Sequence, residues 1–548
     1  MNSYRFPQMA PVPVAPARTV FIVASGDLRP SANVKCWPVQ QQLEADVQRA
    51  VESFGWTVVR GHPFDEGAGH GFIDSQRKGL DVFAGLPPEA PLLVVEGVWQ
   101  YSHHVLAGLR THRGPIMVVA NWNGTFPGLV GLLNLTASLT KAGVEYSSLW
   151  SVDFTDEWAL DGLRTWLDTG RLVHHVHHVH ELPVLDPTVD EVALGRALAD
   201  QLRREKAIIG IFDEGCMGMY NAIFDDELIN PLGIYKERLS QSALVAEMDR
   251  VGDDEAAAVQ AWLDDAGLRF DFGVDEENEL TQAQVTSQLK MYIAALRIAD
   301  DFGLDAVGIQ YQQGLKDVVP ASDLAEGLLN NVARPPVRSR DGSRELYAGE
   351  PLPHFNEVDE GVAVDAVVTN RIWKAMGFDP ATTLHDVRWG DDYGGEFVWV
   401  MMISGSVPAS HNGGYDRSYS KRQPKMYFPL GGGTLSGCSK PGEIVWSRVY
   451  IEDGALHVDL GRGHVVDLPA DETQRRLDAT TPEWPIMHAV LHGVSRDQLM
   501  AKHKANHIQV AYTPDADTAN RAATAKAALF DALGVTVHVC GDVDLVTV

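Results

Sequence analysis

The alternation of short apolar runs with helical patterns over the first 200 residues most constrains the fold. The runs at 19–25, 91–99 and 114–122 are nearly continuous apolar stretches of strand length, and helical periodicity follows each of them. Strands buried on both faces have this pattern, because crossover helices cover both sides of a parallel sheet. The sequence therefore predicts a doubly wound, Rossmann-like α/β domain over residues 1–205.

Two further regions follow. The apolar runs at 206–212 and 306–313, with long helical patterns between them, predict a second doubly wound parallel-sheet domain over residues 206–378. In the last third, strand-length runs are separated by tight turns, and the turn at 452–454 (Glu-Asp-Gly) is a strong hairpin signal. We expect a mainly antiparallel sheet or small barrel over residues 379–548. The predicted fold class is α/β with a β-rich C-terminal domain.

Charge and length exclude several functions. A chain of 548 residues exceeds one hydrophobic core. Its 45 Lys and Arg against 74 Asp and Glu give a net charge of 45 − 74 = −29, which repels nucleic-acid backbones and anionic membranes. The N-terminus has prolines in place of a signal peptide's apolar segment, and no run reaches membrane-spanning length. We expect a cytoplasmic protein with no nucleic-acid or membrane partner.

The cysteines and a histidine run both raise the question of metal binding. Cys36, Cys216, Cys438 and Cys540 lie far apart, which favours reduced, mostly buried cysteines over a thiolate zinc site. The run LVHHVHHVHEL at 172–182 places histidines three apart, a spacing that can bind metal. An enzyme site usually draws different ligand types from different elements. We therefore interpret the run as a solvated linker between the two α/β units.

Three less conspicuous features carry more chemistry. Glu357 and Asp359 precede a helical apolar pattern, Asp386 precedes a strand region, and His507 begins a strand. Each has an ordinary explanation by itself. Acids favour helix N-termini, and single loop acids or strand histidines are common.

Together these features resemble the L-fucose isomerase family, whose fold L-arabinose isomerase shares. No single motif is specific, but their order matches over roughly residues 19–540. In the family, three of these positions bind manganese, and they correspond here to Glu357, Asp386 and His507. The matching pieces are Asn123-Gly124-Thr125 with Pro127-Gly128, Cys216-Met217-Gly218, Gln310 with Gln312, Glu357 before Gly361-Val362, Asp386-Val387-Arg388, Ser404-Gly405-Ser406, Gly431-Gly432-Gly433 and Ala505-Asn506-His507.

The resemblance implies an aldose–ketose isomerase, and the residue chemistry agrees. Such a reaction moves one proton between C2 and C1 and another between O1 and O2, and a cation that bridges both oxygens stabilises the enediolate. Two carboxylates and an imidazole suit Mn²⁺, with Mg²⁺ or Co²⁺ as alternatives. We expect Glu357 and Asp386 to be ligands and the acid–base pair, with His507 as the third ligand. Which carboxylate takes the C2 proton stays open.

The sequence departs from the family where substrate should lie. The tyrosine that follows the family's triple glycine is Thr434 here, and Asn-Trp-Gly before Ala-Asn-His is Lys502-His503-Lys504. Basic side chains near a site commonly bind a substrate anion. With Arg29 they favour an anionic hexose, for which sulfoquinovose, a substrate of some members of the broad family, is the specific candidate. A neutral sugar such as L-fucose or D-arabinose is the alternative.

The resemblance also implies assembly and substrate contacts. The family forms hexamers in which a neighbouring subunit's tryptophan reaches the site, and Trp99 matches that tryptophan. We expect the substrate to contact Arg29, Trp99, Asn123, Met217, Gln310, Gln312, Ser406, Thr434, Lys502, His503, Lys504 and Asn506.

Two functions from other classes compete. A catalytically inactive sugar-binding protein would keep the fold, but it would not need all three candidate ligands. A lyase or glycoside hydrolase would use Glu357 and Asp386 as its acid and base, which leaves His507 unexplained. Metal dependence separates the isomerase from a glycosidase.

Overall fold

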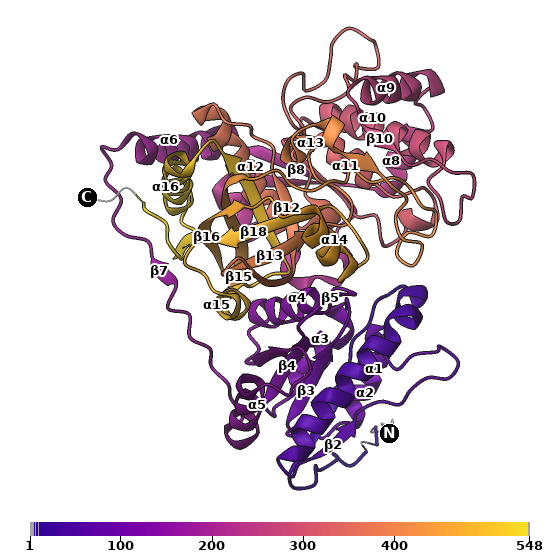
Figure 1. Cartoon of the computed structure of the whole chain (residues 1–548), viewed down its shortest axis with the longest axis vertical. Helices are drawn as coiled ribbons and strands as arrows, with labels where there is room; N and C mark the ends of the chain where they lie inside the picture. Colours follow the sequence, from indigo (N-terminus) through magenta and orange to yellow (C-terminus); the bar gives the residue numbers. More distant parts are fainter. Residues whose placement is uncertain (1–4, 6, 9, 546–548) are drawn as a thin grey trace, which may run out of the picture.

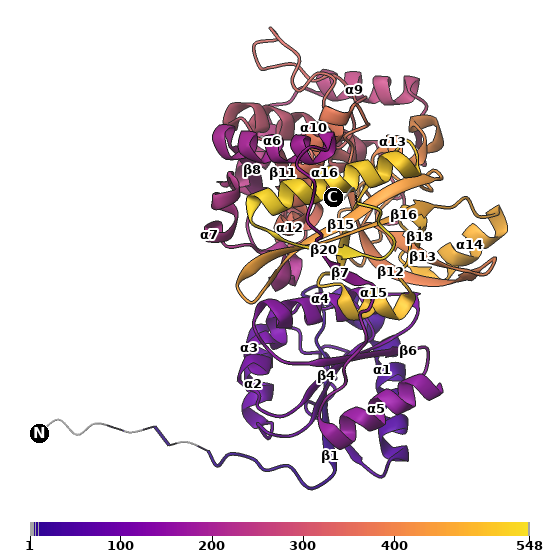
Figure 2. The same cartoon turned by 90° about the vertical axis from the view of Figure 1, so that its left-hand side faces the viewer.

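The computed structural model describes residues 5, 7–8 and 10–545. It confirms the predicted fold class, with two parallel sheets followed by a mainly antiparallel barrel. Figures 1 and 2 show the N-terminal domain at one end of the molecule and the two other regions together at the opposite end.

The N-terminal domain is a five-stranded parallel sheet in the order β2-β1-β3-β4-β6. Val94, Val118 and Leu129 pack on one face, and Val95, Val119 and Leu163 on the other. Burial on both faces explains the continuous apolar runs. Its elements are β1 Thr19–Val23, α1 Pro30–Ser53, β2 Thr57–Arg60, α2 Gln76–Gly85, β3 Leu92–Glu96, α3 His103–Thr111, β4 Ile116–Asn121, β5 Gly124–Thr125, α4 Gly128–Lys141, β6 Ser147–Ser151 and α5 Glu157–Thr169.

A strap then crosses from the first domain to the rest of the chain. It includes β7 (Val179–Glu181), which pairs with β20 (Thr536–Cys540) of the C-terminal sheet. Figure 1 shows the strap running from α5 along one side of the molecule to α6 (Asp190–Glu205).

The second domain has a three-stranded parallel sheet in the order β11-β8-β9. The helix predicted at 280–305 is α10, whose ends carry a Thr281 capping box and Gly303 in the left-handed conformation. The elements are β8 Ala207–Phe212, η1 Cys216–Gly218, η2 Tyr220–Ala222, α7 Asp226–Ile229, η3 Asn230–Leu232, β9 Ile234–Leu239, α8 Gln241–Met248, α9 Asp253–Asp265, β10 Arg269–Phe270, α10 Gln282–Phe302, β11 Ala306–Ile309, η4 Leu315–Asp317, α11 Asp323–Leu329, η5 Asn356–Val358 and α12 Glu360–Met376.

The C-terminal region is a closed antiparallel barrel. Its strands follow the order β15-β19-β12-β13-β18-β16, and β16 pairs back with β15. The predicted hairpin turn joins β15 to β16, with Asp453 and Gly454 both at positive φ. The elements are β12 Thr383–Tyr393, β13 Glu396–Met402, α13 Ala409–Asn412, η6 Tyr415–Arg417, β14 Tyr419–Ser420, β15 Gly442–Glu452, β16 Ala455–Val465, α14 Ala470–Asp478, β17 Thr480–Thr481, β18 Ile486–Leu491, α15 Arg496–Lys502, β19 His507–Thr513, α16 Ala516–Leu533 and β20.

No helix in the described ranges has both the length and the apolar character needed to cross a bilayer. Cys36 and Cys540 are buried free thiols, whereas Cys438 is exposed.

Candidate active site

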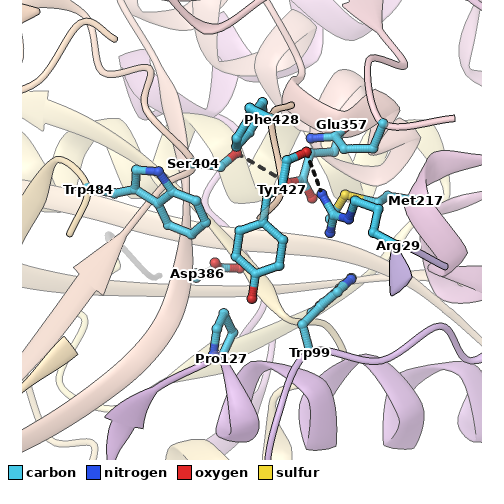
Figure 3. A pocket seen from close by; sticks show the side chains of 11 residues that line it. Arg29, Trp99, Pro127, Met217, Glu357, Asp386, Ser404, Tyr427, Phe428 and Trp484 are labelled. Atoms are coloured by element: carbon cyan, nitrogen blue, oxygen red, sulfur yellow. Dashed lines mark hydrogen bonds between the residues drawn. The ribbon is translucent and has the colours of Figure 1, made fainter. Parts of the chain in front are cut away.

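A small cavity lies where the three regions meet, and it contains both predicted catalytic carboxylates (Figure 3). Its volume is about 20 Å³, which is room for roughly one water molecule. We call it the inner cavity. Its walls are Arg29, Trp99 and Pro127 from the N-terminal domain, Met217, Gln312 and Glu357 from the second domain, and Asp386, Ser404, Tyr427, Phe428 and Trp484 from the C-terminal region.

Asp386 and His507 are brought together by strand pairing. Asp386 lies on β12 and His507 begins the neighbouring β19, where the two residues are direct cross-strand partners. Asp386 lies within β12, whereas the sequence placed it just before a strand. Side chains of cross-strand partners project to the same face of the sheet. The pairing therefore explains how two residues distant in the sequence share one site.

Glu357 reaches the same place from a strained turn before α12. Its backbone is left-handed, with φ 56° and ψ 16°, and Val358 follows with φ 55°. Such conformations are costly for residues other than glycine and cluster at functional sites. The side chain accepts a hydrogen bond from Ser404 Oγ at 3.2 Å. Asn356 in turn donates to Ser404 Oγ at 3.1 Å.

The three side chains face one another around His507 Nε2. This nitrogen lies 3.6 Å from Glu357 Oε2 and 3.5 Å from Asp386 Oδ1. All three residues are at most 8% exposed. The arrangement aims two carboxylate oxygens and one imidazole nitrogen into one buried space.

Asp359 fixes the orientation of that imidazole. Its Oδ2 lies 2.8 Å from His507 Nδ1 and 2.6 Å from Arg448 Nη1, while its Oδ1 caps α12 by accepting from the backbone of Gly361 and Val362. A hydrogen bond at Nδ1 determines the role of the other ring nitrogen. Asp359 thus directs His507 Nε2 toward Glu357 and Asp386.

Burial and mutual charge shift the pKa values of these groups. Burial raises the pKa of Glu357 to about 7, and Asp386 raises it further while His507 opposes the shift. Burial also raises the pKa of Asp386, against the opposing charges of His507 and Arg388. Burial would lower the pKa of His507, but the Asp359 hydrogen bond and the surrounding carboxylates raise it. Each group depends electrostatically on the others.

The donor set fits a divalent cation that prefers oxygen and imidazole ligands. A carboxylate that hydrogen-bonds the other ring nitrogen, as Asp359 does for His507, is also usual for metal-binding imidazoles. No group of three or more His, Cys, Asp or Glu side chains among the described residues has the geometry of a formed metal centre. The contacts of 3.5 and 3.6 Å exceed hydrogen-bond length. The three side chains are therefore convergent but not drawn together as ligands.

Four of the predicted substrate contacts line the inner cavity: Arg29, Trp99, Met217 and Gln312. Arg29 is held by Asp27, with Nη2 2.6 Å from Oδ2, so its charge is already compensated. Trp99 reaches the inner cavity within its own chain, although the resemblance led us to expect a ring from a neighbouring subunit. Trp99 Nε1 and Gln312 Oε1 are buried without protein partners.

Five other predicted contacts do not line this cavity. Asn123 stabilises its own turn through Thr125, Gln310 donates to the Gly215 carbonyl, and Thr434 accepts from the Lys421 amide. Ser406 forms a bridge with Leu435, and the neighbouring Ser404 lines the cavity in its place. Asn506 donates to Met219 Sδ and, through Asp386, acts on the site indirectly.

The three basic candidates also lie outside the inner cavity. Lys502 pairs with Asp459 at 3.1 Å and donates to Tyr450 Oη. Lys504 donates to Tyr146 Oη at 2.9 Å, and the His503 ring bonds to the His507 carbonyl. These side chains support the protein around β19, and none is directed at the Glu357 and Asp386 carboxylates.

The histidine run lies on the strap, as predicted for a linker, but it is not wholly solvated. His175, His177 and His180 are exposed, whereas His178 is buried. His174 packs between Trp150 and Trp158 and bonds to the Ser148 carbonyl.

Sequence reasoning missed the aromatic wall of the inner cavity, Tyr427, Phe428 and Trp484, and assigned no role to Arg448. Tyr427 and Phe428 stand three to four residues before the triple glycine, in a segment with no helical or strand periodicity. Trp484 lies in a Pro-rich turn. Proximity to the glycine motif was the one signal that could have indicated them.

Comparison with known proteins agrees with the site described above. Residues 404–526 match the family model described as "L-fucose isomerase, C-terminal domain". No curated protein matches the chain. The matched part covers most of the barrel, including Ser404, Tyr427, Trp484 and His507. It confirms the resemblance to the fucose and arabinose isomerases.

The class is therefore that of sugar isomerases, intramolecular oxidoreductases that interconvert aldoses and ketoses. Over residues 404–526, the chain is similar to the C-terminal domain of the L-fucose isomerases within that class.

Proposed function

We propose that this protein is a divalent-metal-dependent aldose–ketose isomerase whose cation is bound by Glu357, Asp386 and His507. The observation that carries the proposal is the convergence of these three side chains, which come from η5, β12 and β19, on one buried space. Bound there, a cation such as Mn²⁺ would polarise the sugar carbonyl and stabilise negative charge on the substrate oxygens.

The protein's own groups would handle protons and position. Glu357 and Asp386 are the two carboxylates that face the cavity and can accept or return the C2 proton. Asp359 and Arg448 hold His507 in place. Trp99, Tyr427, Phe428 and Trp484 exclude water from the reacting atoms, which limits loss of the transferred proton to solvent.

We further propose that the substrate is a neutral aldose. The prediction of an anionic hexose such as sulfoquinovose rested on Arg29, Lys502, His503 and Lys504. The last three do not line the inner cavity, and Asp27 already neutralises Arg29. A sulfonate or phosphate would find no free cation among the lining residues. L-Fucose and D-arabinose type sugars thus become the better candidates.

A panel of neutral and anionic aldoses tests both statements. The protein is stripped with chelator, reloaded with Mn²⁺, Mg²⁺ or Co²⁺, and assayed for ketose. Metal-dependent ketose formation from a neutral sugar is expected. Glu357→Gln should abolish it, whereas Lys374→Gln, which alters an exposed side chain outside the cavity, should leave the rate within about threefold. Faster turnover of sulfoquinovose would contradict the substrate assignment.

The competing hypothesis is a protein that binds sugar without isomerising it. The ketose assay separates this hypothesis from the isomerase. The hexamer implied by the resemblance stays a prediction. Because Trp99 lines the inner cavity of its own chain, this cavity has a tryptophan in its wall without a neighbouring subunit.

A further inference from the structure

Two cavities meet at one side chain, Arg29. The inner cavity holds Glu357 and Asp386 and has about 20 Å³. A second cavity of about 250 Å³, which we call the outer cavity, lies beside it. Its lining includes Ser31, Gln313, Lys316, Met426 and Pro429, together with Arg29 itself. Arg29 therefore stands in the wall between a roomy space and the catalytic carboxylates.

Tyr427 completes that wall. The Arg29 guanidinium lies 4.4 Å from the centre of the Tyr427 ring, and Arg29 Nη1 lies 3.5 Å from the Tyr427 carbonyl oxygen. The same ring also stacks with Trp484, with centroids 6.1 Å apart. Figure 3 shows the Tyr427 side chain in the middle of the site, with its hydroxyl directed toward Trp99 and Pro127.

The segment that carries Tyr427 is anchored at a glycine-rich base, and the polar contacts at its tip are exposed. At the base, Gly433 N donates to Gln288 Oε1 at 2.6 Å, and Gly431 and Gly432 have φ of +70° and +104°. At the tip, Ser31 Oγ donates to the Met426 carbonyl at 2.9 Å, and Lys425 pairs with Glu277 at 2.7 Å, both in exposed positions. Movement of the segment would break exposed polar contacts of this kind and withdraw the buried Tyr427 ring.

Size makes movement necessary for the proposed reaction. The inner cavity accommodates roughly one water molecule. A monosaccharide requires several times that space, because it carries five or six carbons with their oxygens. Tyr427 lines the inner cavity, its neighbour Met426 lines the outer one and Arg29 lines both, so movement of the Tyr427 segment away from Arg29 would open a path between the two cavities.

We propose that Tyr427, closed against Arg29, is the gate through which a sugar passes from the outer cavity to Glu357 and Asp386. The gate also selects substrate, because a ring that must close over the ligand admits a monosaccharide and excludes longer saccharides. This inference rests on the proposed isomerase function for the identity of the ligand, but not for the existence of the gate.

The Tyr427 hydroxyl adds a specific contact. It is buried, and the one group that acts on it as a hydrogen-bond partner is the Cys36 thiol, which is a weak one. An oxygen that hydrogen-bonds this hydroxyl more strongly than a thiol does would gain affinity. A hydroxyl of the sugar would do so once the gate closes, which makes Tyr427 a specificity-determining residue.

Cys36 provides a direct reporter that needs no sugar. Its thiol is 2% exposed and lies close enough to Tyr427 that each side chain affects the other's pKa. Native alkylation of Cys36 with iodoacetamide, followed by peptide mass spectrometry, therefore measures how often the ring moves away. Because Tyr427 also affects the pKa of Cys36, the alkylation rate of each variant is measured over a range of pH, so that differences in thiolate fraction are separated from differences in access.

The expected pattern is specific. Tyr427→Ala should speed Cys36 alkylation by about tenfold or more, whereas Tyr427→Phe keeps the ring and should stay within about twofold of the parent. Ser31→Ala, which removes only the exposed tip contact, should give an intermediate rise and serves if Tyr427→Ala folds poorly. Phe72→Leu loosens the cluster around Cys36, against which Met426 also packs, but leaves the Tyr427 ring and its contact with Arg29 in place, and it should resemble the parent.

Kinetics then test the selective role. Tyr427→Phe should raise KM for the monosaccharide with a smaller change in kcat, and Tyr427→Ala should gain activity on disaccharides. Equal Cys36 alkylation in Tyr427→Ala, Ser31→Ala and the parent would overturn the gate, as would an equal rise in Phe72→Leu. If no sugar is isomerised by any form, the proposed function fails, and the alkylation result still decides the gate.

Discussion

His507 Nδ1 lies 2.8 Å from Asp359 Oδ2, and this contact turns the opposite ring nitrogen toward Glu357 and Asp386. Asp359 also caps α12 and bonds to Arg448. One buried carboxylate thus joins the helix that follows Glu357 to the strand that begins with His507. The geometry of the site depends on this residue as much as on the three convergent side chains.

Asp359→Asn should therefore weaken metal binding. The amide would keep the side chain's size but lose the charge that orients His507 and balances Arg448. Loss of a carboxylate that hydrogen-bonds a metal-binding histidine typically costs about 10–100-fold in metal affinity or activity. Titration of the stripped protein with Mn²⁺ measures it. Glu350→Gln, at an exposed acid that pairs with Lys374 and does not line the inner cavity, is the control, and an affinity equal to that control would contradict the role.

Substitution of any of the three convergent side chains should also weaken metal binding. Glu357→Gln, Asp386→Asn and His507→Gln each remove one charged or nitrogen donor while nearly preserving volume. Each should lower kcat by at least about 10²-fold and reduce bound metal. Metal content by mass spectrometry and ketose assays check this. A variant that retained full metal binding and full activity would remove that residue from the site.

The pH dependence of stability should include a contribution from His62. Burial lowers the pKa of His62 to about 3, with Arg60 adding to the shift, from the ordinary 6.5. Its Nε2 accepts a hydrogen bond from the Ala24 amide, which needs the neutral ring. The unfolded chain therefore binds a proton more readily, so this contribution is complete above pH 6.5 and declines as the pH falls toward 3.

His62→Gln should remove the contribution of His62 to the pH dependence of stability. Between pH 4 and 6 the slope of unfolding free energy against pH should fall by up to about 1.4 kcal/mol per pH unit relative to the parent. Urea unfolding at several pH values measures the slope. An unchanged slope would show that His62 titrates alike in both states.

Two glycines in one helix offer a matched test of packing. A Cβ at Gly79 would lie 1.8 Å from the His104 carbonyl of α3, whereas a Cβ at Gly85 would meet nothing within 4 Å. Gly79→Ala should destabilise the protein by about 1–3 kcal/mol through overpacking. Gly85→Ala should be neutral or stabilising by up to about 1 kcal/mol, since alanine favours helix. Equal effects would contradict the close approach of α2 and α3.

Much of the fold followed from hydrophobic pattern. The continuous runs became β1, β3 and β4 because both faces of a parallel sheet are buried, and the Asp453-Gly454 turn formed its hairpin. Closure of the barrel through the β15–β16 pairing was not predictable, because register between distant strands is set by tertiary packing. The three convergent side chains were predicted from the order of the motifs along the chain. That order indicates a family resemblance, but it gives no distances between side chains.

The cavity walls could not be predicted in the same way. Lys502 and Lys504 are adjacent to the site in sequence, yet the geometry at the end of α15 directs them to Asp459 and Tyr146. Tyr427 was overlooked because its segment has no regular period, and only the folded chain brings it against Arg29. Proximity in sequence and proximity in space diverge most in such irregular segments.

The most direct measurement of the central claim is ketose formation from neutral aldoses by chelated protein, before and after Mn²⁺ is restored, alongside Glu357→Gln. We predict no ketose without metal, ketose from at least one neutral sugar with metal, and none from the variant under either condition. Ketose formation that persists in thoroughly stripped protein, or in Glu357→Gln, would contradict a metal-dependent isomerase built on Glu357, Asp386 and His507.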